Sequence, residues 1–162
     1  MSVAVTYGSE VTVVETLSDA SLSTKDKTVT HSTYNISKSL SGGSTPAVTK
    51  VSIGPVALDA GAKTVDLTAL TGTNGAVVDL TGLKVQILRI EALSDNANTI
   101  SIEPGSSNGY ALAGADFKLT LAAGQHHTFY GANAAPAVGP SAKTLDLAGT
   151  GSQGVKLTIV AG

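Results

Sequence analysis

Residue types that often carry catalysis occur in this chain, but their spacing does not fit a catalytic geometry. The run Gly105–Gly109 matches the hydrolase pattern G-x-S-x-G, and Asp116 and His126 follow Ser107 in hydrolase order. That pattern needs a serine between a strand and a helix of a large α/β sheet, with the acid and the base on distant loops. The sequence after Gly109 shows no helix pattern, and the spacings are far too short. We therefore predict a loop between strands, no catalytic residues and no enzyme activity.

A second pattern, G-x-G-x-x-G, spans Gly149–Gly154 and follows an expected strand. A dinucleotide site needs a helix directly after the glycines and an acidic residue about 20 positions further on. Here another strand-like run, Val155–Val160, comes next. The glycines therefore predict a flexible hairpin turn rather than a nucleotide site.

Histidine and carboxylate side chains are poorly spaced for a metal site. His126 and His127 are adjacent, so on a strand they point to opposite faces and cannot both bind one ion. With His31, they fit surface or interface positions better. The run Asp95–Asn98 offers oxygen atoms, but it lacks the glycine and the bidentate glutamate of an EF-hand loop. We expect a turn capped by its own side chains there, and no metal or other cofactor.

The charge of the chain argues against nucleic-acid binding. Only 14% of the 162 residues are charged, the formal net charge is −2, and Arg89 is the single arginine. A surface that binds phosphates needs clustered Lys and Arg. No run approaches the 18 or so apolar residues of a membrane helix, and the N-terminus lacks the features of a signal peptide. We expect a soluble protein, made in the cytoplasm, with no nucleic-acid or membrane partner.

Composition and turn residues predict an all-β protein. Val, Leu, Ile and Ala must build the core because only 4% of residues are aromatic, and 18 Gly and 5 Pro supply turns between short strands. From Pro46 onward, strand-like runs recur at short intervals. The turns between them include Asn74-Gly75 and Asn108-Gly109. We predict a jelly-roll-like antiparallel β-sandwich of eight to ten strands over residues 46–162.

The first 45 residues differ in character and predict an N-terminal arm. They are polar, rich in Thr and Ser, and broken by glycine-containing turns. Three alternating runs predict short strands: Val3 with Val5, Val11 with Val13, and Tyr34 with Ile36. These strands carry too few apolar side chains for a core of their own. We expect them to pack on the main domain or on a neighbouring subunit.

The run Leu83–Leu93 is the longest strand pattern in the chain and predicts the central strand. Alternation places Val85, Ile87 and Arg89 on one face and Gln86, Leu88 and Ile90 on the other, so both faces need cover. Glu91 lies two positions after Arg89 and on the same face. This pair fits an ordinary exposed ion pair, and it also fits a subunit contact at the end of the strand.

The chain contains a short internal repeat: Ala62–Leu67, with the sequence AKTVDL, resembles Ala142–Leu147, with the sequence AKTLDL. Two copies are too few for a solenoid. They predict two equivalent corners of a sandwich, with Asp66 and Asp146 bonding backbone amides of turns.

Three sequence segments resemble the small decoration, or cement, proteins of tailed-bacteriophage heads. They are TPAVTKVSIGPVAL at Thr45–Leu58, VDLTGLKVQILRIEALSDNANTISIEPGSSNGY at Val78–Tyr110, and AKTLDLAGTGSQGVKLTIVAG at Ala142–Gly162. The resemblance covers the part after Pro46 and leaves the arm outside it.

The resemblance implies a structural virion protein that forms a homotrimer and binds the major capsid protein on the outside of the head, where capsomers meet. We take six residues as candidate subunit or capsid contacts: Val3, Val5, Tyr7, Tyr34, Arg89 and Glu91. Two other functions stay open from the sequence, a carbohydrate- or receptor-binding sandwich and a tail or spike component.

Overall fold

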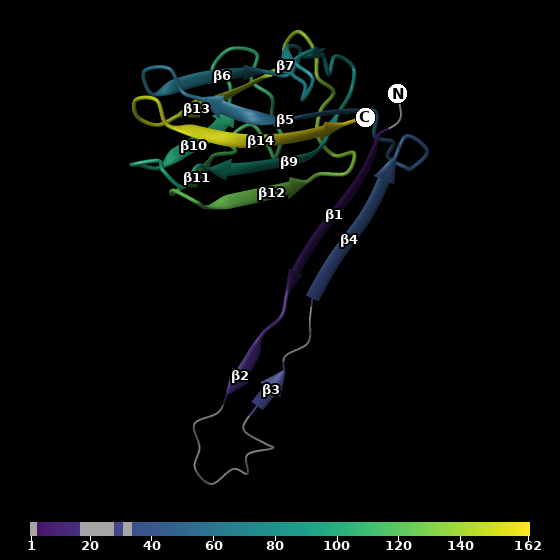
Figure 1. Ribbon diagram of the computed structural model, residues 1–162. Helices are drawn as coiled ribbons and strands as arrows, with labels where there is room; N and C mark the ends of the chain where they lie inside the picture. The colour runs from purple at the N-terminus through teal and green to yellow at the C-terminus, as the bar shows by residue number, and fades with distance from the viewer. Residues whose placement is uncertain (1–2, 17–27, 31–33) are drawn as a thin grey trace.

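The structure is a computed structural model that describes residues 3–16, 28–30 and 34–162. Every regular element in those ranges is a strand, and the strands form a sandwich from which a long hairpin projects (Figure 1). The prediction of an all-β antiparallel sandwich is confirmed. Ten strands, β5 to β14, lie after Pro46, within the predicted range.

Two four-stranded antiparallel sheets make up the layers of the sandwich. The first, which we call the arm-side sheet, has the spatial order β12 (His126–Tyr130), β9 (Val85–Ala92), β14 (Gly154–Ala161) and β5 (Lys50–Ala57). The second, the far sheet, has the order β11 (Leu119–Leu121), β10 (Ile100–Pro104), β13 (Thr144–Ala148) and β6 (Ala62–Asp66). A small hairpin of β7 (Leu70–Thr71) and β8 (Val77–Val78) lies beside β5.

The eight strands of the two sheets pair as a nested set. β5 pairs with β14, β6 with β13, β9 with β12 and β10 with β11. The chain crosses from one sheet to the other at five direct connections: β5 to β6, β9 to β10, β11 to β12, β12 to β13, and β13 to β14. It also crosses from β6 to β9 by way of the β7–β8 hairpin. Most neighbouring strands are therefore distant in sequence, and most connections are corners between layers.

The core between the sheets is aliphatic, as the composition predicts. Its largest fully buried side chains include Leu67, Leu80, Leu88, Ile90, Ile100, Ile102, Leu145, Leu147 and Ile159. Tyr110 is the one aromatic residue among the fully buried side chains of the described part. Its hydroxyl donates to the Pro136 carbonyl at 2.7 Å and accepts from the Val85 amide at 3.1 Å. The buried hydroxyl is thus satisfied, as a polar group away from water must be.

The central position predicted for Leu83–Leu93 is confirmed, because β9 lies between β12 and β14. The predicted alternation of its side chains is wrong at the start of the strand. Val85 packs into the core between the sheets, whereas Ile87 packs into a second cluster under the arm. The pairing of β9 with β14 is irregular here, since Ile87 pairs with Val160 and Val85 pairs with Ala161. Gln86 is the extra residue of this bulge, and a bulge turns the next side chain to the other face.

The turn predicted as a hairpin at Gly149–Gly154 is a corner instead. It joins β13 in the far sheet to β14 in the arm-side sheet. The buried side chain of Asn96 holds the corner by accepting from the Gly154 amide at 2.9 Å and donating to the Gly154 carbonyl at 2.8 Å. The Asp95–Asn98 run is thus a turn whose side-chain amide ties it to the next loop.

The two copies of the internal repeat are neighbours in the far sheet. β6 and β13 pair antiparallel, and Thr64 donates to Asp146 at 2.6 Å across the pair. Both aspartates bond turn amides as predicted: Asp66 accepts from the Thr68 amide and Asp146 from the Ser106 amide, each at 2.8 Å. Lys143 closes the set with an ion pair to Asp66 at 2.9 Å. The repeat therefore reflects a shared structural role, in which each aspartate fixes the backbone of a nearby turn.

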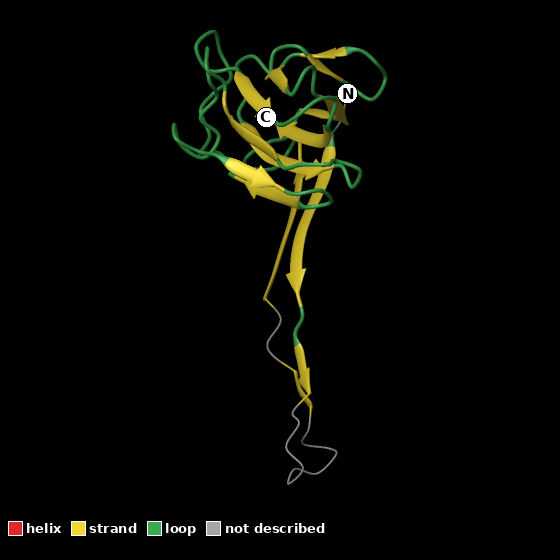
Figure 2. Ribbon diagram, turned by 90° about the vertical axis from the view of Figure 1, so that its left-hand side faces the viewer, coloured by secondary structure: helices red, strands yellow, loops and turns green. Residues whose placement is uncertain are grey.

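The N-terminal residues form one long hairpin that leaves the sandwich (Figure 2). β1 (Ala4–Val11) pairs antiparallel with β4 (Tyr34–Ser41), and further out β2 (Val14–Thr16) pairs with β3 (Thr28–Thr30). The sequence predicts three short strands here, and the described part of the arm has four. The part of the chain that became β3 carries one valine between two threonines and gives no alternating signal.

Candidate functional site: the projecting arm and the face it crosses

The base of the arm is anchored on the outer face of the arm-side sheet. There, one residue from each strand forms a row of directly paired neighbours: Val51, Val160, Ile87 and Tyr130. The apolar residues of the arm that pack on this row or beside it are Val3, Val5, Tyr7 and Leu40. The rings of Tyr7 and Tyr130 stack, with centroids 5.4 Å apart and an interplanar angle of 15°. The arm therefore crosses all four strands from β5 to β12.

The length of this contact explains why the rest of the arm is uncovered. A row across four strands spans roughly 14 Å, because neighbouring strands lie about 4.8 Å apart. The segment from Val3 to Tyr7 spans roughly 13 Å at about 3.3 Å per residue. The sheet is thus fully crossed when the arm reaches Tyr7, and the following residues of β1 extend past the β12 edge (Figure 1).

The apolar face of the arm continues beyond the sheet. Side chains on one face of a hairpin recur every second residue, so Val11 lies on the same face as Val5 and Tyr7. On the partner strand, Ile36 lies on the same face as Leu40, opposite Ser9. Leu40 is buried, whereas Val11 and Ile36 are 63% and 56% exposed. One apolar face is therefore covered at its base and open further out.

Val13 and Val14 extend the exposed apolar surface toward the tip. We call the four exposed residues Val11, Val13, Val14 and Ile36 the arm stripe. A two-stranded hairpin is marginally stable on its own in water. A long hairpin with an open apolar stripe is therefore suited to contact with another protein surface.

The candidate contacts predicted from sequence lie in three settings. Val3, Val5 and Tyr7 pack on the sandwich of their own chain. Tyr34 begins β4 opposite Val11, and its side chain lies outside the described residues. Arg89 and Glu91 are on the outer face of the arm-side sheet, beyond the covered row. The structure thus brings three of the six together, at the base of the arm.

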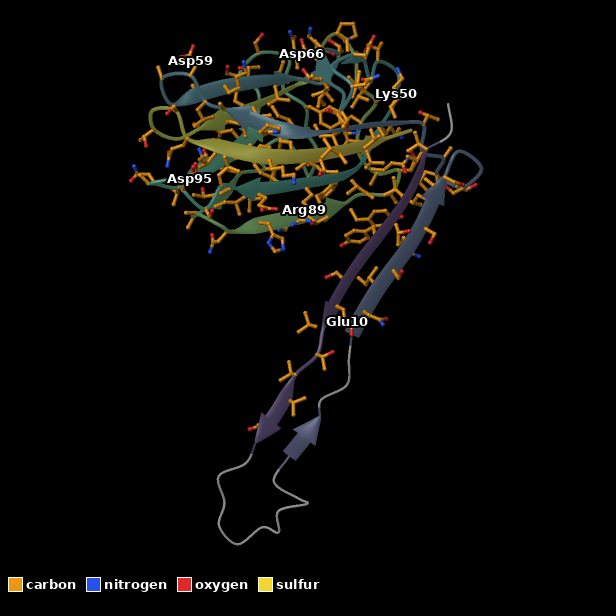
Figure 3. All side chains as sticks on the ribbon, viewed as in Figure 1. Glu10, Lys50, Asp59, Asp66, Arg89 and Asp95 are labelled. Carbon is orange, nitrogen blue, oxygen red and sulfur yellow. The ribbon has the colours of Figure 1, made fainter. Side chains whose placement is uncertain are left out.

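Arg89 and Glu91 form an exposed ion pair, with Nη2 and Oε2 3.0 Å apart. Both side chains are more than a third exposed, so the pair contributes little to stability. Figure 3 shows Arg89 on the sheet and Glu10 far out on the arm. A polar hollow of about 460 Å³ lies between the two elements and is lined by Tyr7, Ser9, Glu10, Arg89, His126 and Thr128.

A second hollow lies at the opposite edge of the arm-side sheet, between β5 and the β7–β8 hairpin. This edge groove measures about 360 Å³ and is lined mainly by apolar atoms, including those of Val3, Val51, Val77 and Val78. Its shape is held by hydrogen bonds, since Lys50 donates to the Asp79 carbonyl and Ser52 donates to the Thr71 carbonyl at 2.8 Å. Val77 on its rim is 73% exposed.

The residues of the hydrolase pattern serve the fold or lie apart. The carbonyl of Ser107 accepts from the Thr144 hydroxyl, which fixes the loop on β13. His126 begins β12 in the other sheet, and Asp116 is exposed in the loop before β11. In the described ranges no group of three or more His, Asp or Glu side chains is placed to hold a metal ion.

Sequence reasoning missed the exposed positions that now stand out. Val11, Val13 and Ile36 were recognised as strand residues, but alternation alone does not say where a neighbouring sheet ends. Ile53 and Val77, the exposed large apolar residues of the sandwich, gave no separate signal. Their exposure depends on the sheet order, which places β5 at an edge.

Comparisons with protein-family models, with curated proteins and with solved structures gave no match for this chain. Among the described residues, no helix is long and apolar enough to cross a membrane.

Proposed function

We propose that this protein is a decoration, or cement, protein of a tailed-bacteriophage head. It binds the major capsid protein on the outside of the shell, as a homotrimer at capsomer junctions, and stabilises the expanded lattice. The observation that carries the proposal is the long hairpin with an apolar face that its own sandwich covers only at the base. Such an arm suits binding to other chains and serves no evident purpose in a free monomer.

The nested pairing of strands supports a jelly-roll type of sandwich in this proposal. In chain order, the first of the eight strands pairs with the eighth, the second with the seventh, the third with the sixth and the fourth with the fifth. Winding such a ribbon around a core produces two sheets of alternating strands, which is the arrangement of jelly rolls in capsid and lectin domains. The fold alone does not decide between these functions, so the arm carries the argument.

The physics of a cement protein fits a small domain with weak individual contacts. In a trimer, the second and third contacts with the shell become intramolecular and raise overall affinity by roughly 10² to 10⁴. A protein that binds only the expanded lattice stabilises that lattice by mass action. The exposed polar face around Arg89 and the open arm are the surfaces available for such contacts.

Binding to purified heads tests the proposal. The protein is mixed with unexpanded and with expanded heads of the phage that encodes it. The heads are then sedimented and imaged by electron microscopy. We expect density at threefold positions of expanded heads, much less binding to unexpanded heads, and heads that survive higher temperature. Absence of binding to expanded heads, or location of the protein on tails in intact virions, would overturn the proposal.

A further inference from the structure

The exposed large apolar residues of the described chain lie in two places. Four belong to the arm stripe, and the other two, Ile53 and Val77, lie at the β5 edge of the sandwich. Val77 is on the rim of the edge groove, and Ile53 lines an adjoining hollow of about 440 Å³ that shares Gly72 and Thr73 with it. Apolar surface that stays open to water on a small protein marks a contact site.

The arm stripe cannot reach the edge groove of its own chain. The arm passes Val3 beside β5, crosses the sheet and leaves it at Tyr130 on β12, the opposite edge. The groove lies at the β5 edge, roughly 14 Å or more behind the point of departure. The outer part of the arm, including β2 and β3, runs away from the sandwich (Figure 1). The arm stripe and the edge groove of one copy therefore do not cover each other.

Both surfaces continue one and the same apolar row. At the β12 edge, the row of Val51, Val160, Ile87 and Tyr130 is continued by the arm face toward Val11 and Ile36. At the β5 edge, Val3 and Val51 line the edge groove together with Val77. The molecule thus carries a projecting apolar element at one end of the row and a receiving apolar groove at the other.

From this arrangement we infer that the arm stripe of one copy binds the edge groove of a second copy of this chain. Different surfaces at opposite ends make a head-to-tail contact, which closes into a ring or continues as a filament. The groove is preformed by the bonds from Lys50 and Ser52, so binding requires little ordering on the receiving side. Each contact is small, but in a closed ring the contacts act together and raise the overall affinity.

The inference rests on the proposed function only for the number of copies, three. The contact between copies itself does not involve the capsid. Its failure and the failure of the proposed function can therefore be told apart by measuring self-association and head binding separately.

Self-association is tested by light scattering after size-exclusion chromatography, over a range of concentrations. We expect the wild-type chain to form a closed oligomer. Val77→Ser in the groove and the pair Val11→Ser with Ile36→Ser in the arm should each weaken association at least tenfold, which corresponds to about 1.4 kcal/mol. Thr6→Ser, on the polar face of β1, serves as the matched control and should leave association unchanged. Because the altered side chains are exposed, circular dichroism should report an unchanged fold.

Disulfide formation identifies which surfaces meet, since the natural chain has no cysteine and gives no background. Chains with Val11→Cys and chains with Val77→Cys are mixed and oxidised. We expect a disulfide-linked heterodimer of the two. The control, Glu10→Cys mixed with Val77→Cys, places the thiol on the opposite face of the arm and should link several-fold less.

Three results would overturn the inference. They are a monomeric wild-type chain at all concentrations, an oligomer that persists in both the groove and the arm variants, and linkage of Val11→Cys only to itself. A monomer that still binds expanded heads would leave the capsid-binding part of the proposed function intact and contradict its homotrimer. An oligomer that forms through the arm and the groove but does not bind heads would support the inference and contradict the proposed function.

Discussion

At the scale of single residues, Asp66 shows how one carboxylate holds a corner. The hydrogen bond from the Thr68 hydroxyl lowers the pKa of Asp66 most, burial opposes this, and Lys143 lowers it further, to about 2. The folded-state pKa lies below the ordinary value of 3.8. The ionised carboxylate therefore stabilises the fold above pH 3.8, and this contribution is lost as pH falls through about 2.

We expect Asp66→Asn to reduce the free energy of unfolding by about 1 kcal/mol at neutral pH, a value discounted because the side chain is about one-third exposed. The difference from wild type should shrink between pH 4 and pH 2, by the order of that figure. Urea unfolding at several pH values measures it. Asp95→Asn, at an exposed turn position, is the control, and an equal loss in that variant would contradict the explanation.

Tyr110 allows a second prediction about stability, because its ring and its hydroxyl are both buried. Tyr110→Phe keeps the ring but leaves the Val85 amide and the Pro136 carbonyl without their partner. A buried polar group without a partner costs about 1–3 kcal/mol. We expect that loss in urea unfolding with an unchanged slope. Tyr130→Phe, which keeps the stack with Tyr7, should cost much less, and equal losses would argue against the buried bonds.

At the scale of elements, the sequence predicts strands well and their partners poorly. Leu83–Leu93 was placed at the centre of a sheet because both its faces are apolar, and β9 is there. The same alternation failed at Val85, since a bulge depends on the partner strand β14 and leaves no trace in β9 itself. The glycines of Gly149–Gly154 predict a turn, but they do not say whether the next strand joins the same sheet, so the corner between β13 and β14 differs from the predicted hairpin.

The arm was the least predictable element for the same reason. Its polar composition indicated an appendage, but pairing between β1 and β4 joins residues that are far apart in sequence. Which apolar residues of the arm are covered depends on the width of the sheet they cross. Val5 and Val11 have the same residue type and the same face, and only their distance from the sheet edge separates them.

Leu40 allows the docking of the arm to be tested apart from the sandwich. Its buried side chain packs with Val48, Ile87 and Val160. Leu40→Ala should weaken the docking of the arm by about 2 kcal/mol, the low end for such changes because the site is at the surface of a sheet. In hydrogen exchange, we expect amides of β1 and β4 to exchange about tenfold or more faster, while β10 and β13 stay protected.

The matched control for that measurement is Ser39→Ala, an exposed position on the opposite face of β4. It should leave exchange in the arm unchanged. Faster exchange throughout both sheets of Leu40→Ala would show instead that the arm and the sandwich unfold as one unit.

At the scale of the whole molecule, the protein combines a self-contained core with an element that has none. The core between the sheets contains none of the described residues of the arm, whereas the second cluster joins the arm to the outer face of one sheet. Loss of the outer arm should therefore leave the sandwich folded. Loss of the base would expose Ile87 and Val160 and cost stability as well.

A shortened arm separates these two effects. Removing residues 9–36 and joining Gly8 to Ser37, which are opposite each other in β1 and β4, through an Asn-Gly turn keeps the base and its tyrosine stack. We expect the thermal midpoint of the sandwich to stay within a few degrees of wild type, because no buried contact of the core is lost. Binding to expanded heads should fall at least tenfold, since the uncovered arm is removed.

The outcome depends on where the binding surface lies. If the shortened protein binds heads as tightly as wild type, the exposed sheet face around Arg89 holds the shell and the arm serves another purpose. Arg89→Ala in the full chain then decides the matter, because that side chain makes only an exposed ion pair and its loss should not affect folding. Reduced binding in the shortened protein with unchanged binding in Arg89→Ala shows that head binding needs the arm, and the oligomeric mass of the shortened protein then separates a direct contact from loss of the oligomer.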